Sequence, residues 1–132
     1  VIQADDGFLL VVSYNPGYQN AVKDLKHSTR QRFVAIEFDF PDVDRETKII
    51  AHESGLEEGM SNQLAVLGQK IRNLREHGLE EGASTRLLIY AARLIKQGIS
   101  PKRACQVALT WGITDELQIQ ETVDQIVSSI FE

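Results

Sequence analysis

In GASTRLLIYAARLIKQG, residues 82–98, a polar start is followed by apolar residues at helical spacing and then by a glycine. Ser84 is a residue type that caps helix N-termini, because its side-chain oxygen accepts hydrogen bonds from free backbone N–H groups. The apolar residues behind it recur on one helical face, at Leu87, Leu88, Tyr90, Ala91, Leu94 and Ile95. The segment therefore predicts an amphipathic helix that begins at Ser84 and ends at Gly98.

The rest of the chain after Pro41 also predicts helices. Asp42 can cap a helix that stops at Gly55. Apolar residues from Met60 onward recur at spacings of four and three, and Ser100 with Pro101 is a cap followed by a first-turn proline. Five helices are expected, over residues 42–54, 60–78, 84–98, 100 to about 111, and 114–130.

Two segments before Pro41 predict β-strands. Residues 8–14, FLLVVSY, are almost continuously apolar, which is typical of a strand buried on both faces. In residues 33–40, FVAIEFDF, the pattern is closer to an alternation of apolar and polar residues, which also favours a strand. The predicted fold class is thus an α/β remnant of two strands followed by an all-α part of about five helices, with domains at 1–41 and 42–132.

Composition narrows the function classes. The 132 residues suit one domain of ordinary size, and a net charge of −5 argues against non-specific binding to nucleic acid or acidic lipid. No apolar run reaches the roughly 18 residues that a membrane span needs. One cysteine, Cys105, excludes an internal disulfide and a cysteine-cluster metal site, so a reducing cytoplasm is expected.

Asn15 follows the first predicted strand, where Pro16 breaks the apolar run. Open α/β sheets bind ligands beyond the carboxyl ends of their strands. An amide at that edge can orient a water molecule against a terminal phosphate. The alternative is a plain turn, because Asn-Pro-Gly is a common turn sequence.

Three arginines are further candidates. Arg30 and Arg32 precede the second predicted strand, from which an arginine can reach a neighbouring subunit's nucleotide; the alternative is a solvated basic flank beside carboxylates. Arg86 falls in the first turn of its helix, where a cation opposes the helix dipole by ~0.3–1 kcal/mol. Because free N–H groups there favour an anion, Arg86 predicts a bound anion nearby.

Long stretches of the chain resemble the MoxR-type AAA+ ATPases, and within them the CbbQ/NirQ/NorQ group. The matching stretches are SYNPGYQ (13–19), KHSTRQRF (26–33) and RNLREHGLEEGASTR (72–86). The resemblance implies two strands of an AAA+ sheet followed by a helical lid. It also implies that Asn15 is the sensor-1 asparagine, Arg32 the arginine finger with Arg30 as a second candidate, and Arg86 the sensor-2 arginine.

The resemblance further implies hexameric rings that bind ATP and Mg²⁺ between subunits. Members of the group activate metal-containing or carbon-fixing enzymes, such as nitric oxide reductase and rubisco, usually with a von Willebrand factor A-domain partner. This sequence departs from the pattern in two respects. No glycine is followed by lysine, so a phosphate loop is missing. Asp115-Glu116 follows a helix start at Thr114, and therefore is no Walker B pair.

We therefore expect the C-terminal part of such an ATPase, with no catalysis, cofactor or metal on this chain alone. The first 40 or so residues are expected to be rearranged, self-paired or swapped into a dimer, because strands without partners recruit other strands. A different hypothesis is a helix-turn-helix over residues 84–111 that binds DNA or protein, with Lys96, Lys102 and Arg103 near the turn. The net charge argues against the DNA version.

Overall fold

The computed structural model describes residues 2–13, 26–74, 79 and 82–132. The chain divides into two compact units, Val1–Phe38 and Asp39–Glu132. Each unit is described by itself. The assignment of residues 1–41 and 42–132 to two functional domains stays a prediction.

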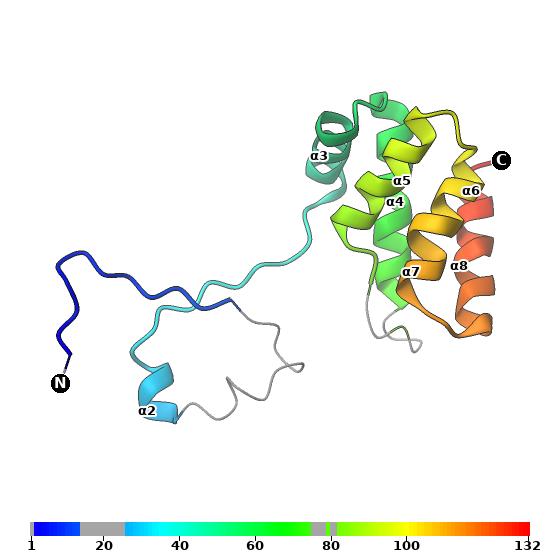
Figure 1. Ribbon diagram of the computed structural model, residues 1–132. Helices are drawn as coiled ribbons and strands as arrows, with labels where there is room; N and C mark the ends of the chain where they lie inside the picture. Colours follow the sequence, from blue (N-terminus) through cyan, green and yellow to red (C-terminus); the bar gives the residue numbers. More distant parts are fainter. Residues whose placement is uncertain (1, 14–25, 75–78, 80–81) are drawn as a thin grey trace. The chain divides into compact units, whose positions relative to one another are not determined.

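The second unit is built from helices (Figure 1). Long helices α3 (Val43–Ser54), α4 (Glu58–Arg72) and α5 (Thr85–Lys96) come first. A further helical run consists of α6 (Pro101–Cys105), the π-helical turn η2 (Gln106–Thr110) and α7 (Trp111–Ile113), and α8 (Leu117–Ile130) closes the unit. The helical part of the predicted fold is confirmed.

Three of the predicted helix ends, at Asp42, Ser84 and Gly55, follow the expected chemistry. Ser100 precedes α6 and Pro101 begins it, but the Ser100 side chain makes no capping hydrogen bond. The Asp42 carboxylate accepts a hydrogen bond from the Arg45 N–H at 2.8 Å, and Ser84 Oγ accepts one from the Leu87 N–H at 3.4 Å. Gly55 ends α3 with φ of 69°, in the left-handed region where a side chain is strained. Glu57 also caps α4, accepting from the Met60 N–H at 2.6 Å, which the sequence analysis did not anticipate.

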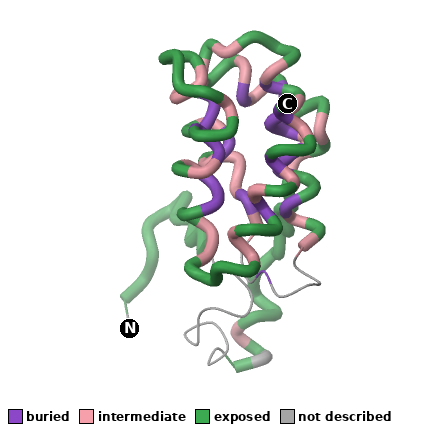
Figure 2. Tube along the Cα trace, turned by 90° about the vertical axis from the view of Figure 1, so that its right-hand side faces the viewer, coloured by how far each residue is buried: buried purple, intermediate pink, exposed green. Residues whose placement is uncertain are grey.

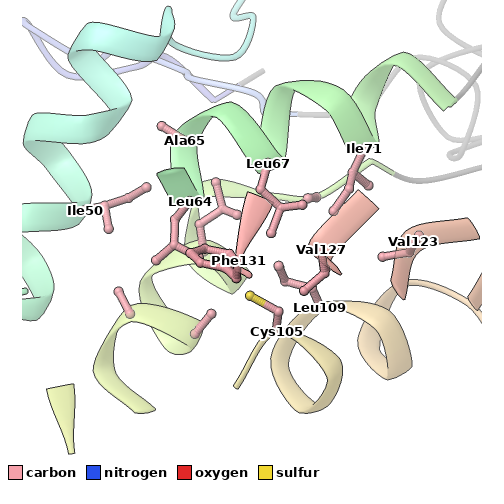
Figure 3. Packing of buried hydrophobic residues seen from close by; sticks show 14 of the residues in the cluster. Ile50, Leu64, Ala65, Leu67, Ile71, Cys105, Leu109, Val123, Val127 and Phe131 are labelled. Atoms are coloured by element: carbon pink, nitrogen blue, oxygen red, sulfur yellow. The ribbon is translucent and has the colours of Figure 1, made fainter. Parts of the chain in front are cut away.

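The hydrophobic core lies between these helices. α4 packs against α3, α5 and α8, and α6 packs against α5 and α8. In Figure 3, apolar side chains of α4 and α8 point toward Cys105 and Leu109 from the α6–η2 run. Figure 2 shows that the buried residues follow the inward faces of the helices, as amphipathic patterns require.

The π-helical turn was not predicted. It places Thr110 in the interior, where the Thr110 hydroxyl donates to Asp124 Oδ1 of α8 at 2.7 Å. Tyr90, which the apolar pattern placed on the apolar face of its helix, is 45% exposed, and Trp111, directly after the π-helical turn, is 50% exposed. The extra residue of a π turn rotates the residues that follow it around the helix axis, so their faces depart from a strict 3.6-residue pattern.

The first unit corrects the sequence analysis. Its described residues form one short helix, α2 (His27–Arg30), and no strand. The predicted strands 8–14 and 33–40, the second of which ends two residues into the second unit, form no strand in their described residues, and Tyr14 lies outside those. Apolar side chains there stay exposed, at 80% for Leu9 and 93% for Val34. A strand exists only when a neighbour pairs with its backbone groups, and the apolar pattern predicts burial without specifying that neighbour.

Candidate functional site

The start of α5 carries the sequence-predicted residue Arg86. Ser84 caps the helix, Thr85 is its first residue, and Arg86 follows in the first turn with an exposed side chain. The first turn of α5 contains no acidic residue, although an acidic residue is favoured at this end of a helix. A carboxylate reaches this turn from α3 instead.

That carboxylate is Glu46, which forms a buried ion pair with Arg72. Arg72 Nη1 donates to Glu46 Oε2 at 2.8 Å and Arg72 Nη2 donates to Glu46 Oε1 at 2.7 Å. The Glu46 side chain is 1% exposed and the Arg72 side chain 9%. The two parallel bonds are the strongest geometry available to an arginine and a carboxylate.

Further hydrogen bonds connect this pair to the start of α5. The Thr85 hydroxyl donates to Glu46 Oε1 at 2.6 Å, and Arg72 Nε donates to the Ala83 carbonyl at 2.8 Å. The ends of three helices therefore meet here: the start of α3, the end of α4 and the start of α5. We call Glu46, Arg72, Ala83 and Thr85 the buried network.

Two more residues confine the Arg72 side chain. Phe40 lies in the segment before α3, and its ring centroid is 3.9 Å from the guanidinium carbon of Arg72, in cation–π geometry. A Cβ atom on Gly82 would lie 2.9 Å from Arg72 Cγ, closer than side chains tolerate. Only glycine at position 82 therefore lets the segment before α5 pass against Arg72.

Burial of this pair requires that its polar atoms be satisfied. Removing two charges from water is costly, and the attraction between them offsets that cost only when further hydrogen bonds complete the geometry. In the described part of the chain, no buried side-chain nitrogen or oxygen lacks a hydrogen-bond partner. The buried network thus connects α3, α4 and the start of α5 through a buried ion pair whose polar atoms are all hydrogen-bonded.

The sequence-predicted site residues in the described part of the chain are divided between the two units. Arg86 lies at the start of α5 in the second unit, whereas Arg30 ends α2 and Arg32 lies in the turn behind it, both exposed, in the first unit. Asn15 lies outside the described residues. The roles assigned to Asn15, Arg30, Arg32 and Arg86 stay predictions.

Sequence reasoning missed Glu46 and Arg72, although a signal was present. Val43, Glu46, Thr47 and Ile50 fall on one face of α3, so Glu46 occupies the position of a core residue. Arg72 follows Ala65 and Gly68 on one face of α4, where small side chains leave room for a guanidinium. A charged residue on each of two buried faces, with opposite sign, indicates a buried pair.

The other described features relevant to a site or a membrane span are the Cys105 thiol, the metal-ligating side chains and the helices. Burial, with Asp124 nearby, raises the pKa of the Cys105 thiol from 9.0 to about 12, so that thiol is a poor nucleophile. The described residues include no cluster of three or more metal-ligating side chains. Within the same residues, none of the helices has the length and apolarity to cross a bilayer.

The helix-turn-helix hypothesis gains no support from its basic residues. Arg103 Nη1 donates to Gln106 Oε1 at 2.6 Å, and its guanidinium carbon lies 4.9 Å from the Trp111 ring centroid. These contacts hold the Arg103 side chain along its own helix. The DNA-binding and protein-interaction functions stay untested.

The helical unit matches a known family. The family described as CbbQ/NirQ/NorQ C-terminal matches residues 46–130, which begins at Glu46 and includes Arg72 and Arg86. The chain belongs to this family. The resemblance predicted from the sequence is thereby confirmed, and the α3–α8 unit is the structure of the family's C-terminal region here.

Named relatives agree. The chain is 56% identical over 115 residues to the denitrification regulatory protein NirQ of Pseudomonas aeruginosa, covering 87% of this chain and 44% of that protein. It is 49% identical to protein NorQ of Paracoccus denitrificans, over 98% of this chain and 48% of that protein. For protein CbbQ of Hydrogenophilus thermoluteolus the identity is 46%, over 99% and 49%. The chain spans about half the length of the curated relatives it matches.

Proposed function

We propose that this chain is the C-terminal part of a longer MoxR-type AAA+ ATPase that hydrolyses ATP. The observation that carries the proposal is the family match, with 87–99% of this chain aligned to only 44–49% of each relative described above. The missing phosphate loop supports it, because the residues that grip the phosphates would then belong to the preceding half. In that assembly the α3–α8 unit is the helical lid.

The polar residues take distinct roles under this proposal. Arg86, exposed at the start of α5, contacts the phosphates of a nucleotide bound with Mg²⁺ by the preceding half. Asn15 orients the attacking water. Arg32, or Arg30 beside it, reaches the nucleotide of the neighbouring subunit in a hexameric ring and neutralises the charge that develops on the transferred phosphoryl group.

The exposed apolar segments of the first unit fit the same proposal. Residues 8–13 and 33–40 carry the composition of buried strands but have no partner strand in the described part of the chain. Strands of the preceding half would pair with them and cover their side chains. In this chain alone, such exposed segments favour self-pairing or exchange between two copies.

The biological role proposed is activation of a client enzyme in the cytoplasm. One of the relatives above is named a denitrification regulatory protein, and the other two are named NorQ and CbbQ. We propose a metal-containing enzyme such as nitric oxide reductase, or rubisco, as the client, with a von Willebrand factor A-domain protein as partner.

The test compares two proteins: the full-length protein encoded by the gene that contains this sequence, and the chain 1–132. Phosphate release from ATP with Mg²⁺ should be readily measured for the full-length protein and should not exceed a no-protein control for chain 1–132. One amide and a few arginines are too few contacts to offset the cost of immobilising ATP. A full-length protein without turnover, or ATP turnover by chain 1–132, would overturn the proposal.

The neighbouring-subunit role has its own test. Arg32→Ala in the full-length protein should leave ATP binding nearly intact and lower turnover by about 10³-fold, as arginine fingers do. A mixture of Arg32→Ala subunits with phosphate-loop variants should regain activity, because each supplies the group that the other lacks. Normal turnover by Arg32→Ala would transfer the role to Arg30.

A further inference from the structure

We infer that Arg72 and Glu46 position Arg86, through Thr85, and tie that position to the segment at Phe40. The inference rests on the proposed function for what Arg86 does, but its structural part stands on the buried network alone. Glu46, Arg72 and Thr85 are positioning residues here, since none of them is placed against nucleotide.

The first step concerns what fixes the start of α5. A helix start is normally free to fray, because its first four N–H groups have no partner within the helix. Here the Ser84 cap bond is long, at 3.4 Å, so the cap alone is a weak restraint. The stronger restraints are the Thr85 hydroxyl on Glu46, at 2.6 Å, and the Ala83 carbonyl on Arg72, at 2.8 Å.

These restraints flank Arg86 closely in the sequence. Thr85 is its immediate neighbour and Ala83 lies three residues before it. With both held on a buried ion pair, the Arg86 Cα can neither slide along nor rotate about the α5 axis without breaking a charge-assisted bond. The exposed Arg86 side chain therefore projects from a fixed point.

The second step concerns the connection to the rest of the chain. Phe40 lies two residues beyond the end of the first unit, and its ring covers the Arg72 guanidinium. A shift of residues 39–42 therefore acts on Arg72 directly, and through Arg72 on Ala83 and on Glu46. Glu46 is connected to the same segment, because its backbone N–H donates to the Asp42 carbonyl at 2.9 Å. Both partners of the buried pair therefore contact the entering segment as well as the residues at the start of α5.

Lysine could not replace Arg72 in this role. The guanidinium makes two bonds to Glu46, one to Ala83 and a stacked contact with Phe40 at once, which requires a planar group with several fixed donors. An ammonium group has neither the plane nor the reach to keep all four. Arg72→Lys should thus behave as a loss of position and not as a conservative change.

The test uses a pair of matched variants, Thr85→Val and Thr85→Ser. Valine has nearly the shape of threonine without the hydroxyl, whereas serine keeps the hydroxyl. In chain 1–132, amide hydrogen exchange of Leu87 and Leu88, whose N–H groups bond to the Ser84 carbonyl, should be about tenfold faster in Thr85→Val and close to wild type in Thr85→Ser. Equal exchange in all three proteins would overturn the positioning role.

The second readout uses ATP turnover in the full-length protein. Thr85→Val should lower kcat/KM about tenfold when Arg86 is present and leave it unchanged in an Arg86→Ala background, because the hydroxyl acts only through Arg86. A merely structural role would lower activity equally in both backgrounds and would overturn the inference. If the full-length protein has no ATP turnover, the proposed function fails while the exchange measurement still decides the positioning role.

Discussion

Breaking the buried pair from one side should cost much more stability than removing both partners. Glu46→Gln keeps the size of the side chain and one acceptor for Thr85, but it leaves the charge of Arg72 buried without its counterion. Arg72→Met keeps roughly the length of the side chain but leaves the Glu46 carboxylate without its counterion. The Glu46 side chain is 1% exposed. Each single variant therefore leaves one uncompensated charge in the interior.

The magnitudes follow from the contacts. Removing one partner of a buried ion pair typically costs about 3–5 kcal/mol in the free energy of unfolding. The double variant Glu46→Gln with Arg72→Met leaves no buried charge and keeps an acceptor for the Thr85 hydroxyl. It loses mainly the partner of the Ala83 carbonyl, worth about 1–3 kcal/mol. The double variant should thus be more stable than either single variant, with a coupling energy of at least about 3 kcal/mol between the two positions.

Urea unfolding of chain 1–132, followed by circular dichroism at 222 nm, measures all four proteins, because the signal comes mainly from helices α3–α8. The midpoint should fall most for the single variants and recover in the double variant, with similar slopes. The buried pair is not the strong interaction described here if the free energy of unfolding of each single variant lies within about 1 kcal/mol of wild type. The same conclusion follows if the effects of the two single substitutions simply add in the double variant. A single variant too unstable to measure still leaves the double variant as the test.

Three smaller predictions test other parts of the unit. Gly82→Ala should lower the free energy of unfolding by about 1–3 kcal/mol, because its Cβ would lie 2.9 Å from Arg72 Cγ. Gly112→Ala, whose Cβ would lie 4.0 Å from Leu87 Cδ2, should be neutral or slightly stabilising, and urea unfolding midpoints compare the two variants. Asp42→Ala should cost about 1 kcal/mol in thermal unfolding, and Asp42→Asn, which can still cap α3, much less. Because the Cys105 pKa is raised to about 12, the unfolded thiol ionises first as pH rises. The free energy of unfolding should therefore fall by up to about 1.4 kcal/mol per pH unit above pH 9, relative to Cys105→Ala, and the two proteins should show no such divergence below about pH 8.

The sequence predicted the helices well because their signals are local. The caps at Asp42 and Ser84, the stops at Gly55 and Gly98 and the 3.6-residue apolar pattern all act within a few residues. The π turn at Gln106–Thr110 was not predicted. It places Thr110 against Asp124 of another helix, a contact that no local pattern contains.

The strand prediction failed and the buried network was missed because both depend on contacts between residues far apart in the sequence. Phe8 and Val34 stand in apolar segments, but no local pattern says which strand pairs with them. Glu46 and Arg72 are 26 residues apart, and only the packing of α3 against α4 brings them together. Arg86 was selected because an arginine is unusual in the first turn of a helix, and that reasoning did not reveal what holds the turn in place.

The central claim is that Arg86, at the fixed start of α5, acts on ATP. Its most direct test is ATP turnover by the full-length protein carrying Arg86→Ala, beside Arg93→Ala as a matched control on the same helix. Arg93 is exposed and its Nη2 donates only to the Glu53 carbonyl, at 3.3 Å, among the described residues. We expect a loss of about 10- to 100-fold for Arg86→Ala, because one bond to a charged phosphate is lost, and near wild-type turnover for Arg93→Ala. Equal turnover by the two variants would contradict the central claim.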